Sequence, residues 1–195
     1  MKNRDAFALS LFLLLSGFIF ASAQSIDLPT SKQLIEEIPG QPQRLNSLPV
    51  SMALSPDKRY VVTVNAGYGT FESKYDQSLA VLDTKTGTVT DFPEARTQAR
   101  TAKQTLYSGL AFSPDGGHLY VSMGSITDST GEKQGDTGNG IVVYKFESGK
   151  VTPERFIKLP LQQLEGGRKT RLIDERDGDK AIPFPAAIAV VKLSG

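Results

Sequence analysis

Short apolar runs separated by turn-forming residues occur along most of the chain after residue 48. The run Val50–Leu54 is mostly apolar, which is typical of a strand buried on both faces. The next run, Arg59–Asn65, is rich in β-branched and aromatic residues and predicts a second strand. Two further runs, Leu79–Asp83 and Thr88–Phe92, flank a short turn that contains Gly87. This order predicts a unit of four short strands.

The same four-strand pattern recurs farther along the chain. Met52–Asp57 (Met-Ala-Leu-Ser-Pro-Asp) matches Leu110–Asp115 (Leu-Ala-Phe-Ser-Pro-Asp), 58 residues later. A second motif occurs at 78–89 and again at 140–151, 62 residues later, and Pro185–Val190 begins a third copy of the first strand. Two motifs that recur in the same order at nearly equal spacing indicate an internal structural repeat.

Repeated units of four short strands are typical of β-propeller blades. A β-sandwich also has short strands, but it gives no reason for two motifs to repeat in register. We therefore predict an all-β fold, a partial β-propeller of two four-stranded blades plus the first strand of a third. Closed propellers have at least about four blades, so we expect a fragment of a longer protein. The predicted divisions are a lead-in segment or closing strand at 24–48, blade 1 at 49–106, blade 2 with long loops at 107–184, and the truncated first strand of blade 3 at 185–195.

The first 23 residues have the three parts of a secretory signal peptide. Lys2 and Arg4 precede an apolar run, Ala6–Phe20, and the run ends at Ala21-Ser22-Ala23. A membrane anchor is the alternative, but the run is shorter than the roughly 20 apolar residues of a spanning helix. The sequence therefore predicts export to the periplasm or the medium, with no membrane attachment after cleavage.

Composition narrows the set of partners. The formal net charge of +1 gives no reason to expect binding to nucleic acid or to an acidic membrane surface. The chain has no cysteine, which excludes disulfides and thiolate metal sites. The predicted partners are instead the remaining propeller blades, supplied by a longer chain or by another protein.

Strand parity predicts that the two ends of each blade differ. Successive antiparallel strands reverse direction, so the long connections all fall on one face and the tight turns on the other. The long connections are 66–77, 93–106, 124–139 and 160–184. Long loops in compact domains are often functional, and the first of these combines glycines, aromatic residues and charges. The ligand-binding residues predicted there are Asn65, Tyr68, Phe71, Lys74 and Tyr75. The alternative is an ordered loop that covers the edge of the blade.

One acidic segment has metal-ligating side chains. Asp174, Asp177 and Asp179 are candidate calcium ligands, because calcium takes several oxygen ligands from a loop bent at glycine. However, their order does not match the alternating calcium-loop pattern, and Arg176 lies among them. This favours a solvated acidic loop. With His118 as the only histidine, no two-histidine metal site can form. We therefore predict no cofactor and no catalytic residue in this segment.

The repeat resembles the YVTN-type (YncE-like) bacterial propeller repeat, in which an apolar-Ala-apolar-Ser-Pro-Asp-Gly strand and turn precede a Tyr-Val strand. The matching elements are Met52–Asp57 with Tyr60-Val61, and Leu110–Gly116 with Tyr120-Val121. Lys58 stands where the first copy would carry the turn glycine. The resemblance implies a propeller fold and does not specify a substrate.

Residues 48–161 also resemble the N-terminal propeller of large exported bacterial proteins that end in a phosphoesterase domain of the alkaline-phosphatase type. The function we predict is an exported, non-catalytic propeller module that binds a protein or small-molecule partner through its long-loop face. The alternative, implied by this second resemblance, is the non-catalytic N-terminal part of an exported metal-dependent phosphoesterase.

Overall fold

The computed structural model describes residues 26–28, 32–34, 45, 48–67, 76–97, 104–125, 127–169, 178–181 and 183–192. The chain divides into two units, Met1–Pro42 and Gln43–Gly195, and each is described by itself. In the first unit, β1 (Ile26–Leu28) and β2 (Lys32–Leu34) pair antiparallel with each other. The predicted signal peptide lies outside the described residues. No membrane-spanning helix occurs in the part of the chain that the structure describes.

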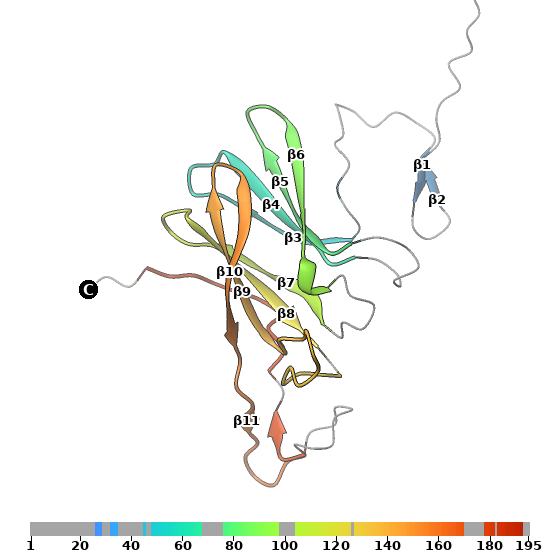
Figure 1. The fold of residues 1–195 in the computed structure, drawn as a ribbon, viewed down its shortest axis with the longest axis vertical. Coiled ribbons are helices and arrows are strands. Elements are labelled where there is room, and N and C mark those ends of the chain that lie inside the picture. Colours follow the sequence, from blue (N-terminus) through green and yellow to red (C-terminus); the bar gives the residue numbers. More distant parts are fainter. Residues whose placement is uncertain are drawn as a thin grey trace, which may run out of the picture. The chain divides into compact units, whose positions relative to one another are not determined.

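Blade 1 is a four-stranded antiparallel sheet in the second unit. Its strands are β3 (Pro49–Leu54), β4 (Tyr60–Asn65), β5 (Ser78–Asp83) and β6 (Thr88–Pro93). Each strand pairs with the next one along the chain (Figure 1). This up-and-down order follows from the connections, since tight turns join β3 to β4 and β5 to β6.

Blade 2 repeats this arrangement after a short 3-10 turn, η2 (Ala95–Thr97). Its strands are β7 (Thr105–Phe112), β8 (His118–Gly124), β9 (Gly140–Glu147) and β10 (Lys150–Lys158), and they again pair in chain order (Figure 1). The predicted all-β fold with two four-stranded propeller blades is confirmed.

The hydrophobic core lies between the two blades. β3 and β4 of blade 1 contact β7 of blade 2. Alternate residues of β4 and β5 point toward blade 2, because side chains along a strand alternate between its faces. The core side chains of blade 1 are Tyr60, Val62, Val64, Leu79 and Val81, and those of blade 2 include Leu106, Leu119, Val121, Met123, Val142, Tyr144 and Phe146. Burial of this surface stabilises the pairing of the blades.

One prediction about the first strands is wrong for blade 1. Val50, Met52 and Leu54 of β3 are 39%, 74% and 52% exposed, although the run was expected to be buried on both faces. The matching residues of blade 2, Leu110 and Phe112, pack against the core because blade 1 covers them. No such layer covers the outer face of β3 among the described residues.

The register of the repeat also differs from the Tyr-Val pairing that the resemblance implied. The Tyr60 amide donates to Ser55 Oγ at 2.9 Å, and the His118 amide donates to Ser113 Oγ at 2.9 Å. The equivalent of Tyr60 is therefore His118 and not Tyr120. The Ser-Pro-Asp turn fixes where the second strand begins, whereas the side chain at that position differs between the copies.

The C-terminal part of the chain continues along blade 2. β11 (Gln162–Gln163) and β12 (Lys180–Ala181) form a two-stranded sheet. Residues 183–192 belong to no sheet, but they lie against β7. Ser108 Oγ donates to the Ala186 carbonyl at 2.6 Å, and a Cβ on Gly109 would lie 2.9 Å from Ile188. The segment predicted to begin a third blade thus lies beside the first strand of blade 2, without a ladder of its own.

Candidate functional site

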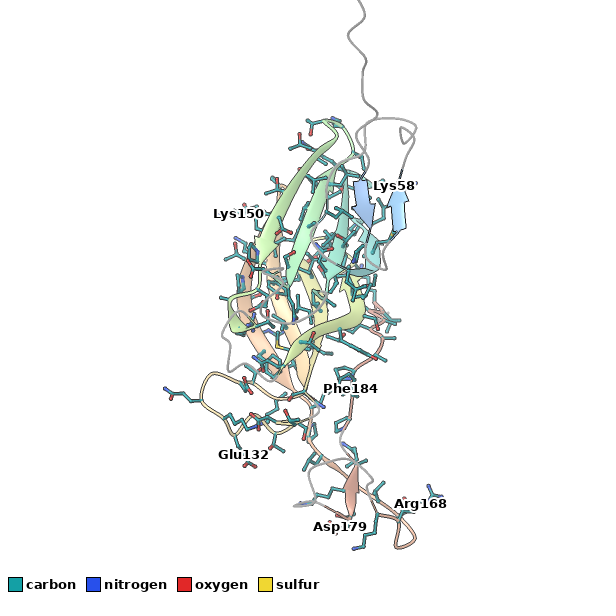
Figure 2. All side chains as sticks on the ribbon, turned by 90° about the vertical axis from the view of Figure 1, so that its right-hand side faces the viewer. Lys58, Glu132, Lys150, Arg168, Asp179 and Phe184 are labelled. Carbon is teal, nitrogen blue, oxygen red and sulfur yellow. The ribbon has the colours of Figure 1, made fainter. Side chains whose placement is uncertain are left out.

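The long loops and the tight turns lie at opposite ends of the blades. Figure 2 shows Lys58 and Lys150, next to tight turns, at one end, and Glu132 and Phe184, in long connections, at the other. We call these ends the tight-turn face and the long-loop face. Hydrogen bonds join the bases of the long loops to one another, as strand parity predicts.

Gln77 forms hydrogen bonds that join the two long connections of blade 1, 66–77 and 93–106, to the start of blade 2. Its carbonyl oxygen accepts the Glu94 amide at 2.8 Å, and its side-chain Oε1 accepts the Leu106 amide at 2.6 Å and the Thr105 hydroxyl at 3.1 Å. A single residue at the end of the 66–77 loop therefore fixes the start of β7. The base of this loop is held by the neighbouring blade.

Among the described residues of the long-loop face, Glu94 forms the most buried ionic contact. The residue is only 3% exposed, and its carboxylate accepts two hydrogen bonds from the Arg96 guanidinium, at 2.6 and 3.0 Å. It also accepts the hydroxyl of Tyr144 from β9. Burial raises the pKa of Glu94, but the hydrogen bonds from Arg96 and Tyr144 lower it more, to below its usual value. Burial and the Glu94 charge raise the pKa of Tyr144 well above its usual value. The pair is therefore a carboxylate and a neutral phenol at neutral pH.

The 125–139 loop of blade 2 is ordered by its own polar side chains. The buried carboxylate of Asp128 accepts the amides of Glu132 at 2.9 Å and Lys133 at 3.0 Å. Burial raises the pKa of Asp128, while these amides lower it to below its usual value. The fully buried Asn139 accepts the Ser125 amide at 2.6 Å and donates to the Pro183 carbonyl at 2.9 Å. The loop is thus tied to a second long connection.

Of the predicted ligand-binding residues, the structure places Asn65. Its side chain is fully buried at the end of β4, where Nδ2 donates to Ser78 Oγ at 3.0 Å. Ser78 in turn donates to Asp91 at 2.6 Å. Asn65 therefore anchors the base of the 66–77 loop. The other four, Tyr68, Phe71, Lys74 and Tyr75, lie outside the described residues.

Of the candidate calcium ligands, the structure places Asp179. It precedes β12, and its carboxylate accepts Gln163 Nε2 at 2.9 Å, which lowers its pKa. Asp174 and Asp177 lie outside the described residues. Across the described ranges, no three histidine or carboxylate side chains cluster as metal ligands.

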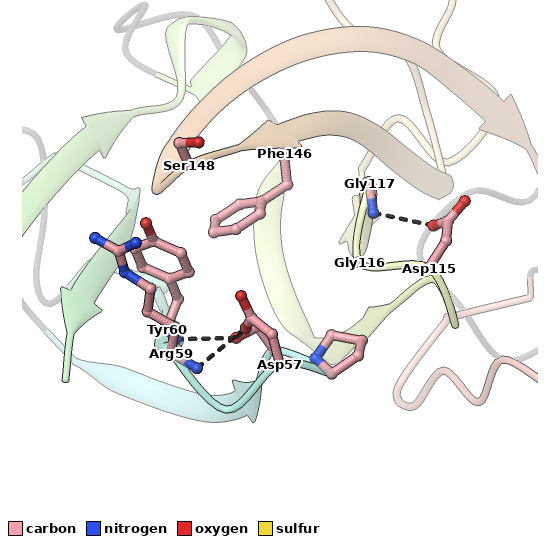
Figure 3. Close-up of a pocket in the computed structure, with 10 residues that line it drawn as sticks. Asp57, Arg59, Tyr60, Asp115, Gly116, Gly117, Phe146 and Ser148 are labelled. Carbon is pink, nitrogen blue, oxygen red and sulfur yellow. Dashed lines mark hydrogen bonds between the residues drawn. The ribbon is translucent and has the colours of Figure 1, made fainter. Parts of the chain in front are cut away.

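The tight-turn face has a feature that the sequence reasoning missed. The two Ser-Pro-Asp turns have the same geometry: Ser55 donates to Asp57 and Ser113 to Asp115, each at 2.5 Å. Lys58 adopts the left-handed conformation (φ 60°) that Gly116 adopts in the second turn (φ 75°). Between the turns lies a cavity of about 270 Å³ (Figure 3). It is lined by Ser55, Pro56, Asp57, Arg59, Tyr60, Asp115, Gly116, Gly117, Phe146 and Ser148.

Comparison with known proteins gives matches to solved structures only. No family model and no curated protein matches this chain. Hydrazine synthase of Kuenenia stuttgartiensis matches 62% of this chain and 32% of its own, at 18% identity and a TM-score of 0.40. A candidate 6-phosphogluconolactonase from Bacteroides uniformis matches 73% of this chain and 37% of its own, at 16% identity and a TM-score of 0.41. A protein from Lactobacillus plantarum matches 68% and 39%, at 17% identity and a TM-score of 0.36. The chain thus spans a third to two fifths of the length of these proteins, and nothing about its activity follows from them.

Proposed function

We propose that this chain is an exported, non-catalytic propeller module that binds a protein or small-molecule partner through its long-loop face. The observation that carries the proposal is the ordering of the 125–139 loop. Asp128 and Asn139 hold four backbone groups of long connections in place. Such preorganisation lowers the entropy that a binding loop loses when it meets a partner.

The cross-blade contacts give a second reason to favour this face. Gln104, which precedes β7, accepts the Thr137 amide at 2.7 Å and donates to the Arg96 carbonyl at 3.3 Å. Loops from both blades therefore share one set of hydrogen bonds. A surface made by several loops on a rigid base is a common form of binding site.

The test is a footprint of whatever binds the exported native protein. Molecules that co-purify with it would be identified by native mass spectrometry, and hydrogen exchange would be compared with and without them. Protection within 66–77 and 125–139 is the expected result. The control is Lys150→Ala on the tight-turn face, which should retain binding. Protection confined to the tight-turn face would overturn the assignment.

We further propose that another propeller blade covers the outer face of β3, as part of a longer chain or of another protein. Support comes from the repeat, since Met52 and Leu54 match Leu110 and Phe112, which blade 1 covers. Full burial of a side chain of this size stabilises a protein by about 1.5–3 kcal/mol. In the native complex Met52→Lys should weaken blade assembly, measured by size-exclusion chromatography with light scattering; unchanged assembly would contradict the proposal.

We also propose that the two blades are of the YVTN type. The identical Ser-Pro-Asp turn geometry in both copies supports blades of the YVTN type. A phosphoesterase attached to the propeller is the alternative for the whole protein. Metal-dependent hydrolysis of a chromogenic phosphate ester by the full-length protein, absent from this segment, would support that alternative.

A further inference from the structure

The segment 183–192 lies against blade 2 by side-chain contacts and not by strand pairing. It takes part in no strand ladder of the described chain. Two side chains of blade 2 hold its carbonyl oxygens instead. Ser108 Oγ donates to the Ala186 carbonyl at 2.6 Å, and Asn139 Nδ2 donates to the Pro183 carbonyl at 2.9 Å. Undocking of this segment therefore breaks no pair of strands, which makes it a low-cost local opening.

Two glycines of blade 2 form the seat of the segment. A Cβ on Gly109 would lie 2.9 Å from Cγ1 of Ile188. A Cβ on Gly124 would lie 2.7 Å from the ring of Phe184, which also packs edge to face on Tyr107 with ring centroids 4.7 Å apart. The missing side chains let an aromatic and a β-branched residue approach the backbone of blade 2 closely. The segment is thus seated at specific positions.

Asn139 connects this segment to the long loop that precedes β9. Its side chain is fully buried, and besides donating to Pro183 it accepts the Ser125 amide at 2.6 Å. Ser125 Oγ in turn accepts the Asp128 amide at 2.9 Å. The Asp128 carboxylate accepts the Glu132 amide, also at 2.9 Å. A continuous path of hydrogen bonds therefore runs from the docked segment into the loop, and Figure 2 shows Phe184 and Glu132 at the same end of the molecule.

Undocking of the segment removes the acceptor of a buried donor. Without the Pro183 carbonyl, Nδ2 of Asn139 loses the acceptor that the described residues supply, and a buried polar group without a partner is costly. When Asn139 turns toward water for a new partner, the Ser125 amide loses its acceptor as well. We propose that 183–192 is a latch whose docking on blade 2 orders the 125–139 loop and thereby sets the affinity of the long-loop face. Only the effect on affinity rests on the proposed function of that face.

The test is hydrogen exchange of the full chain, followed amide by amide by NMR. Ile188→Ala weakens the seat at Gly109, which belongs to β7 and not to the loop. We expect about fivefold faster exchange at the amides of Ser125 and Glu132, because Ile188 is half-buried and full burial of such a side chain shifts an equilibrium by more than about tenfold. Exchange within 186–190 should accelerate together with the loop, while β8 stays protected.

Two further variants make the test specific. Val191→Ala is the matched control, because it shortens an apolar side chain of the same segment that is 74% exposed. It should leave the exchange of the loop unchanged. Ser108→Ala removes the hydrogen bond to the Ala186 carbonyl and leaves both glycine seats intact. It should accelerate exchange of the loop in the same direction as Ile188→Ala.

The coupling also acts in the opposite direction. A partner bound to the long-loop face should slow exchange within 186–190, because coupling between two sites is reciprocal. Protection of the loop by the partner without any effect on 186–190 would refute the latch and leave the proposed function standing. A partner footprint that omits 125–139 would instead refute the proposed function, and the exchange results of the variants alone would still test the latch.

Three results in the variants would overturn the proposal. Faster exchange within 186–190 with unchanged exchange at Ser125 and Glu132 would mean that the segment undocks without loosening the loop. Equal acceleration in Ile188→Ala and Val191→Ala would mean that the seat at Gly109 has no special role. Unchanged exchange at both places in Ile188→Ala and Ser108→Ala would mean that these contacts do not hold the segment.

Discussion

The hydrogen bond from Tyr144 to Glu94 crosses from blade 2 to the end of blade 1, and Tyr144→Phe removes it with little other change. The ring stays in the core, where Tyr144 is only 3% exposed. A hydrogen bond to a charged group contributes about 1.5–3 kcal/mol. The carboxylate would still accept the guanidinium of Arg96 at 2.6 and 3.0 Å. We therefore expect a loss at the lower end, about 1.5–2 kcal/mol, in the free energy of unfolding.

The assay is urea unfolding at pH 7, followed by far-ultraviolet circular dichroism because the chain has no tryptophan. A double-mutant cycle with Glu94→Gln isolates the contact, and a coupling energy of about 1 kcal/mol or more is expected. Tyr120→Phe is the matched control, since it removes a hydroxyl from the same blade that makes no hydrogen bond among the described residues; it should change stability by less than about 0.5 kcal/mol. A loss in Tyr144→Phe no larger than in this control would refute the reasoning.

Three further predictions concern stability. Because folding lowers the pKa of Glu94, the contribution of Glu94 to the free energy of unfolding is complete above its usual pKa of 4.5 and is lost as the pH falls through the lower folded-state value. Folding raises the pKa of Tyr144, so stability also declines as the pH rises above 10. Urea midpoints measured from pH 2 to 11 should follow this course, and a flat profile in that range would contradict it. Gly140→Ala should destabilise the fold by about 1–3 kcal/mol, because a Cβ there would lie 2.4 Å from the Ile157 carbonyl oxygen. Thermal unfolding would measure this loss of stability, and an unchanged midpoint would be evidence against the close packing at Gly140. Asp128→Ala should accelerate hydrogen exchange at the amides of Glu132 and Lys133, because both amides donate to the Asp128 carboxylate, while β8 and β9 stay protected. Equal exchange rates in the variant and the native protein would show that Asp128 does not order the 125–139 loop.

The fold was predictable because the turn chemistry repeats. Ser-Pro-Asp occurs twice at a spacing of 58 residues, and each copy forms the same turn in the structure. The register of the following strand was misjudged, since Tyr60 is matched by His118, and no local rule links these two side chains. Burial of Met52 was also misjudged. Its environment depends on whether another layer covers β3, and a strand's own apolar pattern carries no information on that.

The sites were predictable only in part. Strand parity indicated that the long loops share one face, and the hydrogen bonds of Gln77 and Gln104 join their bases. The role of Asn65 as a buried anchor was not foreseen, because its partner, Ser78, lies 13 residues away across a long loop. The cavity near Asp57 was missed for a similar reason. It forms only where turns of two blades meet Phe146, and that meeting depends on how the blades pack.

The substitution of His118 for Tyr60 in the repeat has a consequence for how such chains assemble. Blade 1 presents Tyr60, Val62 and Val64 to its neighbour, while the matching positions of blade 2 are His118, Tyr120 and Ser122. The same face therefore carries different side chains in the two blades, even though their backbones repeat. Tandem proteins with interchangeable units are prone to pair in the wrong order during synthesis. A surface that packs against one of these two faces is therefore not complementary to the other, which disfavours pairing of blades in the wrong order.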